Sequence, residues 1–355
     1  MNIRYRTEHT VGELHAFVDL EIAIWGLSAR DAVPMNLLHA LTSNGGVLIG
    51  AYDGDQPVGM ALGFPARRNR RWLLWSHMTG VHPDYQRRGI GFALKQHQKS
   101  WALENGFSQM RWTFDPLRAG NAYFNLARLG AQADTYHIDY YGEMTDTINA
   151  GLPSDRVEAT WNLNSDLPDP PDMSSLHALT ETDCNAVALR ADSDGAPIIS
   201  QDLSPETKHQ FVEIPTRFPH GELALKWRLA LRTVLQPALK QGASLTAFWR
   251  VSSRCWYVLS APAPWFLYVV ECADGSLYTG ITTDLARRIA QHNSGHGAIY
   301  TTARRPVRCL GSWRFSTRSH ALRAEMAFKR QSRATKLACI KQKGPFQSGE
   351  FLDDC

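Results

Sequence analysis

A proline-containing segment near residue 262 divides this chain into two parts of opposite charge. Ser260-Ala-Pro-Ala-Pro264 carries no charge, and its two prolines favour an extended spacer over a helix or a central strand. Residues 1–263 hold 24 Lys/Arg and 27 Asp/Glu, whereas residues 264–355 hold 14 and 7. An acidic body followed by a basic last quarter predicts at least two separately packed units, the second of which meets a polyanion.

Length and a second proline-rich stretch predict a further subdivision. At 355 residues the chain exceeds one ordinary domain of about 100–200 residues. The acidic and proline-rich run at 166–173 cannot continue a helix or a central strand. We therefore expect an α/β domain over 1–163, an accessory α/β extension over 164–262, a small α/β domain over 263–345 and a flexible tail over 346–355.

Composition excludes several classes of protein. Apolar residues make up 44% of the chain and charged residues 20%, values typical of globular domains and unlike those of disordered chains. The six cysteines are scattered without a Cys-x-x-Cys pair, which favours reduced thiols over a disulfide framework or a zinc site. The charged N-terminus lacks the apolar core of a signal peptide, and no apolar run is long enough to span a membrane. We expect a cytoplasmic protein without a membrane partner.

Strands and helices are expected to alternate in the first segment. Short apolar runs predict strands at 46–52, 57–64, 72–81 and 110–114, and helical periodicity predicts helices at 90–105 and 122–129. Between the third strand and the long helix lies a charged loop with two glycines, Gly89 and Gly91. Glycines there let backbone N–H groups converge at the positive end of the helix, which is a ready site for phosphate.

This loop resembles a known coenzyme-binding motif. Val81-x-Pro-x-x-Gln86-x-x-Gly89-x-Gly91, followed by a helix, is similar to the acyl-CoA loop of the GCN5-related N-acetyltransferases (GNAT). The resemblance covers roughly residues 1–163 and implies that acetyl-CoA is bound, with an amine of unknown identity as acceptor. The residues that the resemblance assigns to the coenzyme are Val81, Gln86, Arg87, Arg88, Gly89, Ile90, Gly91 and Asn121.

The sequence departs from the GNAT pattern at one chemically important position. The family commonly places a tyrosine four residues before the glycine of its last motif, here Gly130, to protonate the departing thiolate. This chain has Leu126 there, which cannot donate a proton. Tyr123, Tyr140 and Tyr141 lie nearby in sequence, although packing is the simpler role for each. The accessory segment 173–260 shows no chemical motif, and a degenerate second copy of the same fold remains an alternative for it.

The basic last quarter begins with a predicted β-hairpin. Residues 265–271 and 277–282 predict strands joined at the turn-forming Asp274-Gly275 pair, so Tyr268 and Tyr278 lie on paired strands. A helix over 285–292 places Arg288 and His292 on one face. Residues 285–349 hold 14 Lys/Arg and a single carboxylate, Glu325. From charge alone, Glu325 is more simply a salt-bridge partner than a metal ligand.

The spacing of these residues reverses that preference. A first-strand tyrosine, Tyr278-x-Gly280, Arg288-x-x-x-His292 and a lone later glutamate resemble the GIY-YIG endonucleases, in particular their small stand-alone bacterial branch, over 265–342. The resemblance implies that Tyr268 activates water, Tyr278 holds the nucleophile or phosphate, and Arg288 neutralises developing charge. It further implies that Glu325 binds Mg²⁺ or Mn²⁺ and that DNA is the substrate, while His292 either relays a proton or is structural.

Two alternatives to a bifunctional acetyltransferase–endonuclease remain open at this point. In the first, acetyl transfer is the activity and the basic domain only docks the enzyme on nucleic acid. In the second, the N-terminal part senses acetyl-CoA without transferring it, which Leu126 favours slightly. The sequence names neither the acceptor nor the preferred form of DNA.

Overall fold

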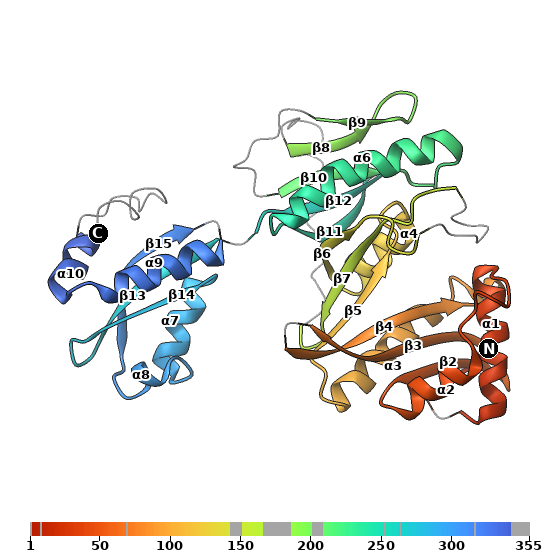
Figure 1. Ribbon diagram of the computed structural model, residues 1–355, viewed down its shortest axis with the longest axis horizontal. Coiled ribbons are helices and arrows are strands. Elements are labelled where there is room, and N and C mark those ends of the chain that lie inside the picture. The colour runs from red at the N-terminus through yellow and green to blue at the C-terminus, as the bar shows by residue number, and fades with distance from the viewer. Residues whose placement is uncertain are drawn as a thin grey trace. The chain divides into compact units, whose positions relative to one another are not determined.

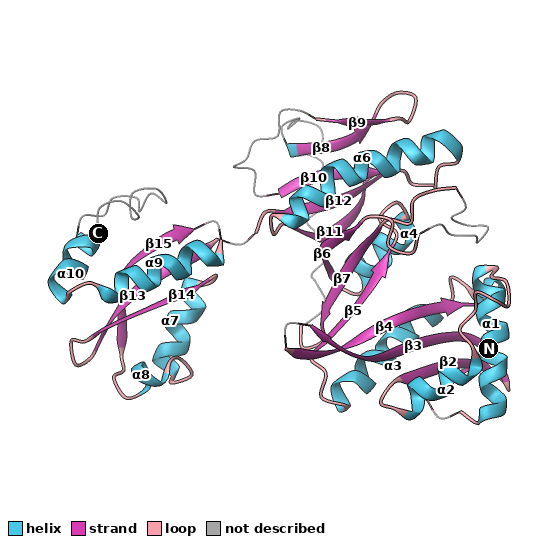
Figure 2. Ribbon diagram, viewed as in Figure 1, coloured by secondary structure: helices cyan, strands magenta, loops and turns pink. Residues whose placement is uncertain are grey.

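The computed structural model describes residues 2–7, 9–68, 70–142, 151–165, 186–200, 209–251, 253–262, 264–315 and 317–341. The chain divides into two compact units, residues 1–261 and 262–355 (Figure 1). Both units mix helices and strands (Figure 2). The segment expected to be a flexible tail, 346–355, lies outside the described residues.

The described residues of the first unit form one twelve-stranded sheet, in the order β1-β2-β3-β4-β5-β7-β6-β11-β12-β10-β8-β9. Its first seven strands are β1 (Ile3–Arg6), β2 (Val47–Asp53), β3 (Gln56–Arg68), β4 (Arg71–Val81), β5 (Gln109–Phe114), β6 (Gln132–His137) and β7 (Arg156–Asn162). The other five are β8 (Val187–Ala191), β9 (Pro197–Ile199), β10 (His209–Ile214), β11 (Ser244–Val251) and β12 (Arg254–Ser260).

Helices cover both faces of the first part of this sheet. Successive residues of a strand point to opposite faces. Accordingly, Leu48 of β2 packs with helices α1 (Val11–Trp25) and α2 (Met35–Ser43), whereas Val47 and Ile49 pack in the cluster that includes α3 (Ile90–Glu104). This part is therefore a three-layer α/β/α arrangement, and α3 lies on the opposite face from α1 and α2.

The second part of the sheet repeats the strand order of the first. A short α4 (Ala119–Ala122) and a π-helix (Tyr123–Arg128) connect β5 to β6, while α6 (Gly221–Lys240) connects β10 to β11. The order β4-β5-β7-β6 is matched by β8-β10-β12-β11, with a parallel first pair in both sets. The two sets meet where β6 pairs with β11, antiparallel. The described residues of the accessory segment thus contain a partial copy of the fold, and its sequence holds no second Gln-x-x-Gly-x-Gly motif.

Buried polar contacts tie the two sets together. Arg228 of α6 donates two hydrogen bonds to Asp115, at 2.6 and 2.8 Å, and its side chain is 1% exposed. The Tyr257 hydroxyl donates to the Pro116 carbonyl at 2.7 Å. An unpaired buried ion costs far more than a paired one, so these contacts make the two sets one structural unit.

The second unit is a small three-stranded antiparallel sheet with helices. Its sheet has the order β14-β13-β15, from β13 (Trp265–Cys272), β14 (Leu277–Thr282) and β15 (Val307–Phe315). The helices are α7 (Leu285–Ser294), α8 (Ile299–Thr302), α9 (Arg318–Arg330) and α10 (Arg333–Lys341). Thr317 caps α9, since its hydroxyl accepts a hydrogen bond from the His320 amide. The core of this unit centres on Leu267, Val269 and Phe328.

The α/β class expected from the sequence is confirmed, and most expected elements lie within a few residues of the observed ones. The structure corrects the expected helix at 122–129, which is mostly a π-helix. Within the described ranges, no helix is both long and apolar enough to cross a bilayer.

Candidate functional site

The coenzyme loop predicted from sequence lies between β4 and α3. Val81 ends β4, and its carbonyl accepts a hydrogen bond from the Gln86 side chain at 3.2 Å. Arg87 and Gly89 both have positive φ angles, +61° and +82°, a conformation that glycine adopts without strain. Gly89 precedes α3 and offers no side-chain cap, so the first amides of the helix keep their hydrogen-bonding capacity for an external acceptor.

The other predicted coenzyme residues differ in exposure. Ile90 is 3% exposed and packs in the core, which leaves only its backbone amide for a ligand. Arg88 is exposed and its guanidinium lies 5.4 Å from the centre of the Tyr85 ring. Gly91 is in the first turn of α3, and Asn121 is exposed on α4. Gln86, Arg87, Arg88, Gly89, Ile90 and Gly91 thus lie in one continuous loop and the first turn of α3, whereas Asn121 comes from a different element, α4.

Strands β4 and β5 separate beside this loop. They pair in parallel only at Leu74–Met110 and Trp75–Arg111. On its other edge β4 pairs with β3 from Arg71 to Val81, and a bulge at His77 shifts the register between Gly63–Ser76 and Leu62–Met78. The two strands thus form a fork whose edges carry backbone groups not used in a β4–β5 ladder.

A buried lysine that the sequence analysis missed lies at this fork. Lys95 of α3 is 2% exposed and donates hydrogen bonds to the Ser76 hydroxyl at 2.9 Å and the Gln98 side-chain oxygen at 3.0 Å. Its Nζ also lies 3.9 Å from the centre of the Trp112 ring. Among the described residues no carboxylate forms an ion pair with it. Burial therefore lowers the pKa of Lys95 to about 7.

The position of the missing general acid is apolar in the structure as well. Leu126 is 1% exposed and belongs to the core cluster of the first unit. Of the nearby tyrosines, Tyr123 lies beneath the Arg250 guanidinium, at 4.9 Å, and the Tyr141 hydroxyl lies 3.1 Å from that of Thr113. Tyr140 packs edge-on against Tyr141, with 4.8 Å between ring centres. Each of these tyrosines has a packing or hydrogen-bonding partner.

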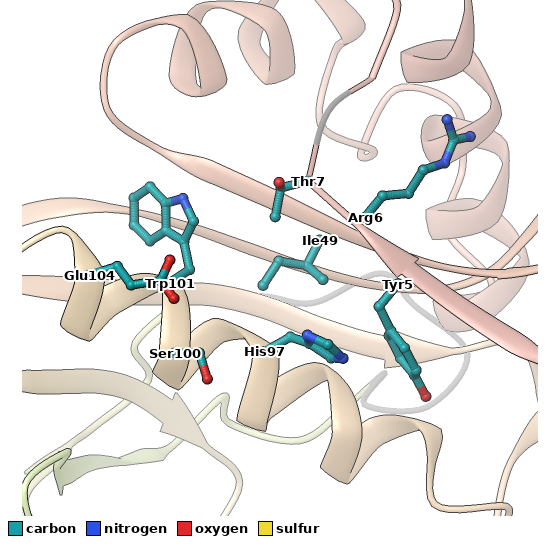
Figure 3. A pocket seen from close by; sticks show the side chains of 8 residues that line it. All are labelled: Tyr5, Arg6, Thr7, Ile49, His97, Ser100, Trp101 and Glu104. Carbon is teal, nitrogen blue, oxygen red and sulfur yellow. The ribbon is translucent and has the colours of Figure 1, made fainter.

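A separate pocket of about 240 Å³ lies between β1 and the second half of α3 (Figure 3). Tyr5 stacks on His97 there, with 4.5 Å between ring centres. Its lining consists of Tyr5, Arg6, Thr7, Ile49, His97, Ser100, Trp101 and Glu104. None of the residues predicted for either site lines this pocket.

In the second unit, the predicted residues converge on the Tyr268 hydroxyl. Tyr268 on β13 and His292 on α7 are both fully buried, and the hydroxyl lies 2.8 Å from His292 Nε2. Arg288 Nε donates a hydrogen bond to the same oxygen at 3.2 Å. Tyr278 on β14 packs against the His292 ring, with 5.2 Å between ring centres.

The glycine of the Tyr-x-Gly motif is required by this packing. A Cβ atom on Gly280 would lie 2.7 Å from the Tyr268 hydroxyl oxygen and 2.9 Å from the ring carbon that bears it. Real Cβ contacts are essentially never shorter than 3.0 Å. Any side chain at 280 would therefore displace the hydroxyl from His292 and Arg288.

Thr301, which sequence reasoning missed, holds the other side of the His292 ring. Its hydroxyl lies 2.6 Å from Nδ1 and donates to the Ala298 carbonyl at 2.9 Å. The Ala298 amide also approaches Nδ1, at 3.5 Å, but this contact is much longer than that of the hydroxyl. Since the hydroxyl has one proton and gives it to the Ala298 carbonyl, we assign the Nδ1–H to His292, donating to Thr301. His292 Nε2 is then the acceptor for the Tyr268 hydroxyl.

Burial sets the charges of this group. It raises the pKa of Tyr268 to about 12, aided by the neighbouring Tyr278 and Glu325 and opposed by Arg288. Burial, with a further contribution from Arg288, lowers the pKa of His292. The hydrogen bond to Tyr268 raises the pKa of Arg288, with a smaller contribution from Tyr278. At neutral pH the group is thus a protonated tyrosine, a neutral histidine and a charged arginine.

Glu325 lies on α9 within electrostatic range of Tyr268. Its side chain is 14% exposed, and Oε1 accepts a hydrogen bond from Lys329 at 2.8 Å. The described residues hold no cluster of three or more His, Cys, Asp and Glu side chains that would form an all-protein metal cage. One carboxylate fits Mg²⁺, which commonly keeps several waters and takes one or two carboxylates together with substrate phosphates.

Comparison with known proteins identifies two domains in the chain. The sequence profile of the acetyltransferase (GNAT) family matches residues 14–127, and that of the GIY-YIG catalytic domain matches residues 264–338. A UPF0213 protein of Cupriavidus pinatubonensis is 53% identical over 88 residues, which are 98% of that protein and 24% of this chain. The chain belongs to the UPF0213 family.

The UPF0213 region is the second unit, and the chain also carries a GNAT domain. A second UPF0213 protein, from Streptococcus agalactiae, is 53% identical over 90% of its length and 22% of this chain. Among solved structures, a GNAT acetyltransferase of Elizabethkingia anophelis with acetyl-CoA bound covers 45% of this chain and 98% of its own, at 16% identity and a TM-score of 0.35. Both domains belong to families of enzymes.

Proposed function

We propose that this chain is a bifunctional enzyme, a metal-dependent endonuclease joined to an acetyl-CoA-dependent N-acetyltransferase. The observation that carries the nuclease assignment is the placement of the Tyr268 hydroxyl between His292 Nε2 and Arg288 Nε, at 2.8 and 3.2 Å. A phenol with a pKa near 12 cannot take a proton from water by itself at neutral pH. A neutral imidazole that accepts its proton removes this obstacle.

The residues of the second unit then have distinct roles in phosphodiester hydrolysis. As Tyr268 takes a proton from the attacking water, its own proton passes to His292 Nε2. The water oxygen bonds to phosphorus, the P–O bond to one sugar oxygen breaks, and that oxygen leaves with the electron pair and takes a proton from solvent. Arg288 stabilises the negative charge that builds up on the phosphate, and Tyr278 positions the phosphate or the water. Glu325 would hold Mg²⁺ or Mn²⁺, which supplies Lewis-acid stabilisation of the phosphate when bound. The remaining surface arginines and lysines would bind the DNA backbone without reading its sequence.

The nuclease proposal is tested by nicking of supercoiled plasmid DNA with and without Mg²⁺. Glu325→Gln should abolish metal-dependent nicking while DNA binding persists. Lys329→Gln is the matched control, because it removes the ion-pair partner of Glu325 from the same helix face and leaves the carboxylate in place. Wild-type protein that cleaves no form of DNA in the presence of Mg²⁺ or Mn²⁺ would refute the proposal and leave a docking role for the basic unit.

For the first unit, we propose that the amides of Arg88–Gly91 hold the coenzyme pyrophosphate and that the acetyl thioester lies at the β4–β5 fork. In transfer, the amine nitrogen bonds to the carbonyl carbon, the C–S bond breaks and its electron pair leaves with sulfur. A proton must reach the sulfur, and the amine proton passes to solvent. Leu126 cannot donate a proton, whereas the Lys95 ammonium group lies at the fork and is half protonated near pH 7. We assign the proton to Lys95.

Calorimetric binding of acetyl-CoA, run beside thiol release over a panel of amines, tests this half. Gly89→Ala should weaken binding about tenfold, because the left-handed backbone that presents the loop amides becomes strained. Gly106→Ala is the control at the other end of α3, with a nearly equal φ of +80° and equally open space around its Cβ. Binding without thiol release on any amine would favour an acetyl-CoA sensor.

A further inference from the structure

A basic hairpin in the acidic first unit has no role in either site. The turn between β3 and β4 carries Arg67, Arg68, Arg70 and Arg71, followed by Trp72, and all five side chains are exposed. Its sequence from Phe64 to Ser76 contains no carboxylate. Since residues 1–263 have three more acidic than basic residues, four arginines in five positions are a local reversal of charge.

The arginines of this hairpin make few ion pairs with the described carboxylates. Arg68 has one distant ion pair, 3.7 Å from Glu158, and its side chain is 51% exposed. For Arg67, Arg70 and Arg71 no ion pair is found within the described part of the chain. Arg67 lies instead over the ring of Trp72, at 5.9 Å, on the same side of the hairpin. Guanidinium groups held this way can bind phosphate oxygens without first breaking a salt bridge.

Trp72 supplies the second element of the surface. It is 61% exposed, more than any other large apolar side chain among the described residues of the first unit, although tryptophan is usually highly buried. An exposed indole beside guanidinium groups is the combination that stacks on an unpaired base while the adjacent backbone is neutralised. A duplex would hide its bases from such a ring.

We propose that the β3–β4 hairpin binds single-stranded nucleic acid, with Arg67, Arg70 and Arg71 on the phosphates and Trp72 stacked on a base. The first unit would thereby contact nucleic acid by itself. This inference does not depend on cleavage by the second unit, because it concerns binding through a different surface.

The test uses the full chain in EDTA, which removes metal-dependent cleavage, and fluorescence anisotropy of a labelled 20-nucleotide oligo(dT). Arg67→Gln/Arg70→Gln/Arg71→Gln should weaken binding at least tenfold and reduce the salt slope by about 2, at about 0.7 per phosphate contact. The matched control is Arg30→Gln/Arg190→Gln/Arg217→Gln, which removes the same charge from exposed positions elsewhere in the unit. An equal loss in both triple variants would overturn the proposal.

Trp72→Ala separates stacking from charge. It should weaken oligo(dT) binding about tenfold and leave binding of an abasic strand of equal length unchanged, because stacking needs a base. Photo-cross-linking of an oligonucleotide containing 5-bromouracil to the wild-type chain should label the peptide that contains Trp72. Equal binding of abasic and oligo(dT) strands by the wild type, or labelling confined to residues 264–355, would contradict the assignment.

Discussion

The two units bury ionisable groups in opposite ways. At the β4–β5 fork, Lys95 is buried with only neutral partners, the Ser76 hydroxyl and the Gln98 amide oxygen. Around Tyr268, the phenol oxygen and both ring nitrogens of His292 have hydrogen-bond partners, and a charged arginine reaches the phenol from the partly exposed face of α7. The first arrangement can change its charge near neutral pH, whereas the second keeps a protonated phenol and a neutral imidazole there.

The largest expected effect comes from removing the hydroxyl at the centre of the matched group. Tyr268→Phe keeps the buried ring but takes away the atom that contacts both His292 and Arg288. Plasmid nicking should fall about 10³-fold, within the range for a lost general base, while the protein stays folded and loses only about 1–3 kcal/mol of stability from the unpaired His292 and Arg288. Nicking within a few fold of wild type would show that another group activates the water.

Gly280→Ala should disturb the same atom without removing it. The added Cβ would collide with the Tyr268 hydroxyl, so we expect roughly a 100-fold loss of nicking and a destabilisation of about 1–3 kcal/mol from overpacking. Gly311→Ala in β15 is the control, because its Cβ would meet no atom closer than 3.6 Å. Similar nicking rates in the two variants would mean that the hydroxyl position is not critical.

Lys95→Met tests how burial of this lysine makes the stability of the protein depend on pH. Because the pKa of Lys95 falls from 10.5 in the unfolded chain to about 7 in the folded one, the unfolded chain binds the proton more tightly between these values. The wild type is therefore penalised most at low pH and regains stability as the pH rises. Urea unfolding should show Lys95→Met gaining about 3 kcal/mol more at pH 6 than at pH 9.

Lys99→Met on the same helix is the control for this pH dependence, since Lys99 is only half-buried. A gain that does not depend on pH would mean that the lysine stays charged throughout that range in the folded protein, as it is in the unfolded chain.

The smallest effect is expected at Thr301. Thr301→Val removes the partner of His292 Nδ1, so the tautomer that presents Nε2 to Tyr268 is no longer fixed. Nicking should fall about tenfold with unchanged DNA affinity. Since the pKa of His292 is lowered, wild-type nicking should persist below pH 6.5. In the variant, the pH at which the nicking rate falls on the acid side of its pH profile should shift. Thr302→Val is the control, because the exposed Thr302 hydroxyl donates to the same Ala298 carbonyl as Thr301 but does not contact His292. It should change neither the nicking rate nor its pH dependence.

Local spacing explains what the sequence predicted. Arg288 and His292 are four residues apart on one helix, and Tyr268 and Tyr278 are on strands of one hairpin, so pattern alone brought them together. Glu325 stood out as the lone acid among many bases, but charge alone favoured a salt bridge for it, and its predicted role as a metal ligand came from the resemblance to the GIY-YIG endonucleases. A helical projection of α3, with Lys95 on the buried side beside Leu94 and Gln98, contained the missed signal.

Other features of the two sites depend on contacts between separate elements, which the spacing of residues along the chain does not predict. Lys95 meets Ser76 and Trp112 only after α3 packs on the fork of β4 and β5. Thr301 reaches His292 because the chain turns back through α8. Helices α1 and α2 and the π-helix were missed, the π-helix because its sequence fits an ordinary helix equally well. Whether 1–163 and 164–262 act as separate domains stays a prediction.

The ion pair between Asp115 and Arg228 joins residues 113 positions apart. A protein shortened after residue 163 would keep the acid, lose the base and expose the edge of β6 to other chains. Such a fragment is expected to aggregate or to be degraded before any acetyl transfer could be assayed. The chain is therefore best divided at the spacer near residue 262, both in the laboratory and by gene fusion or fission. The first unit, residues 1–261, has to be kept as one piece.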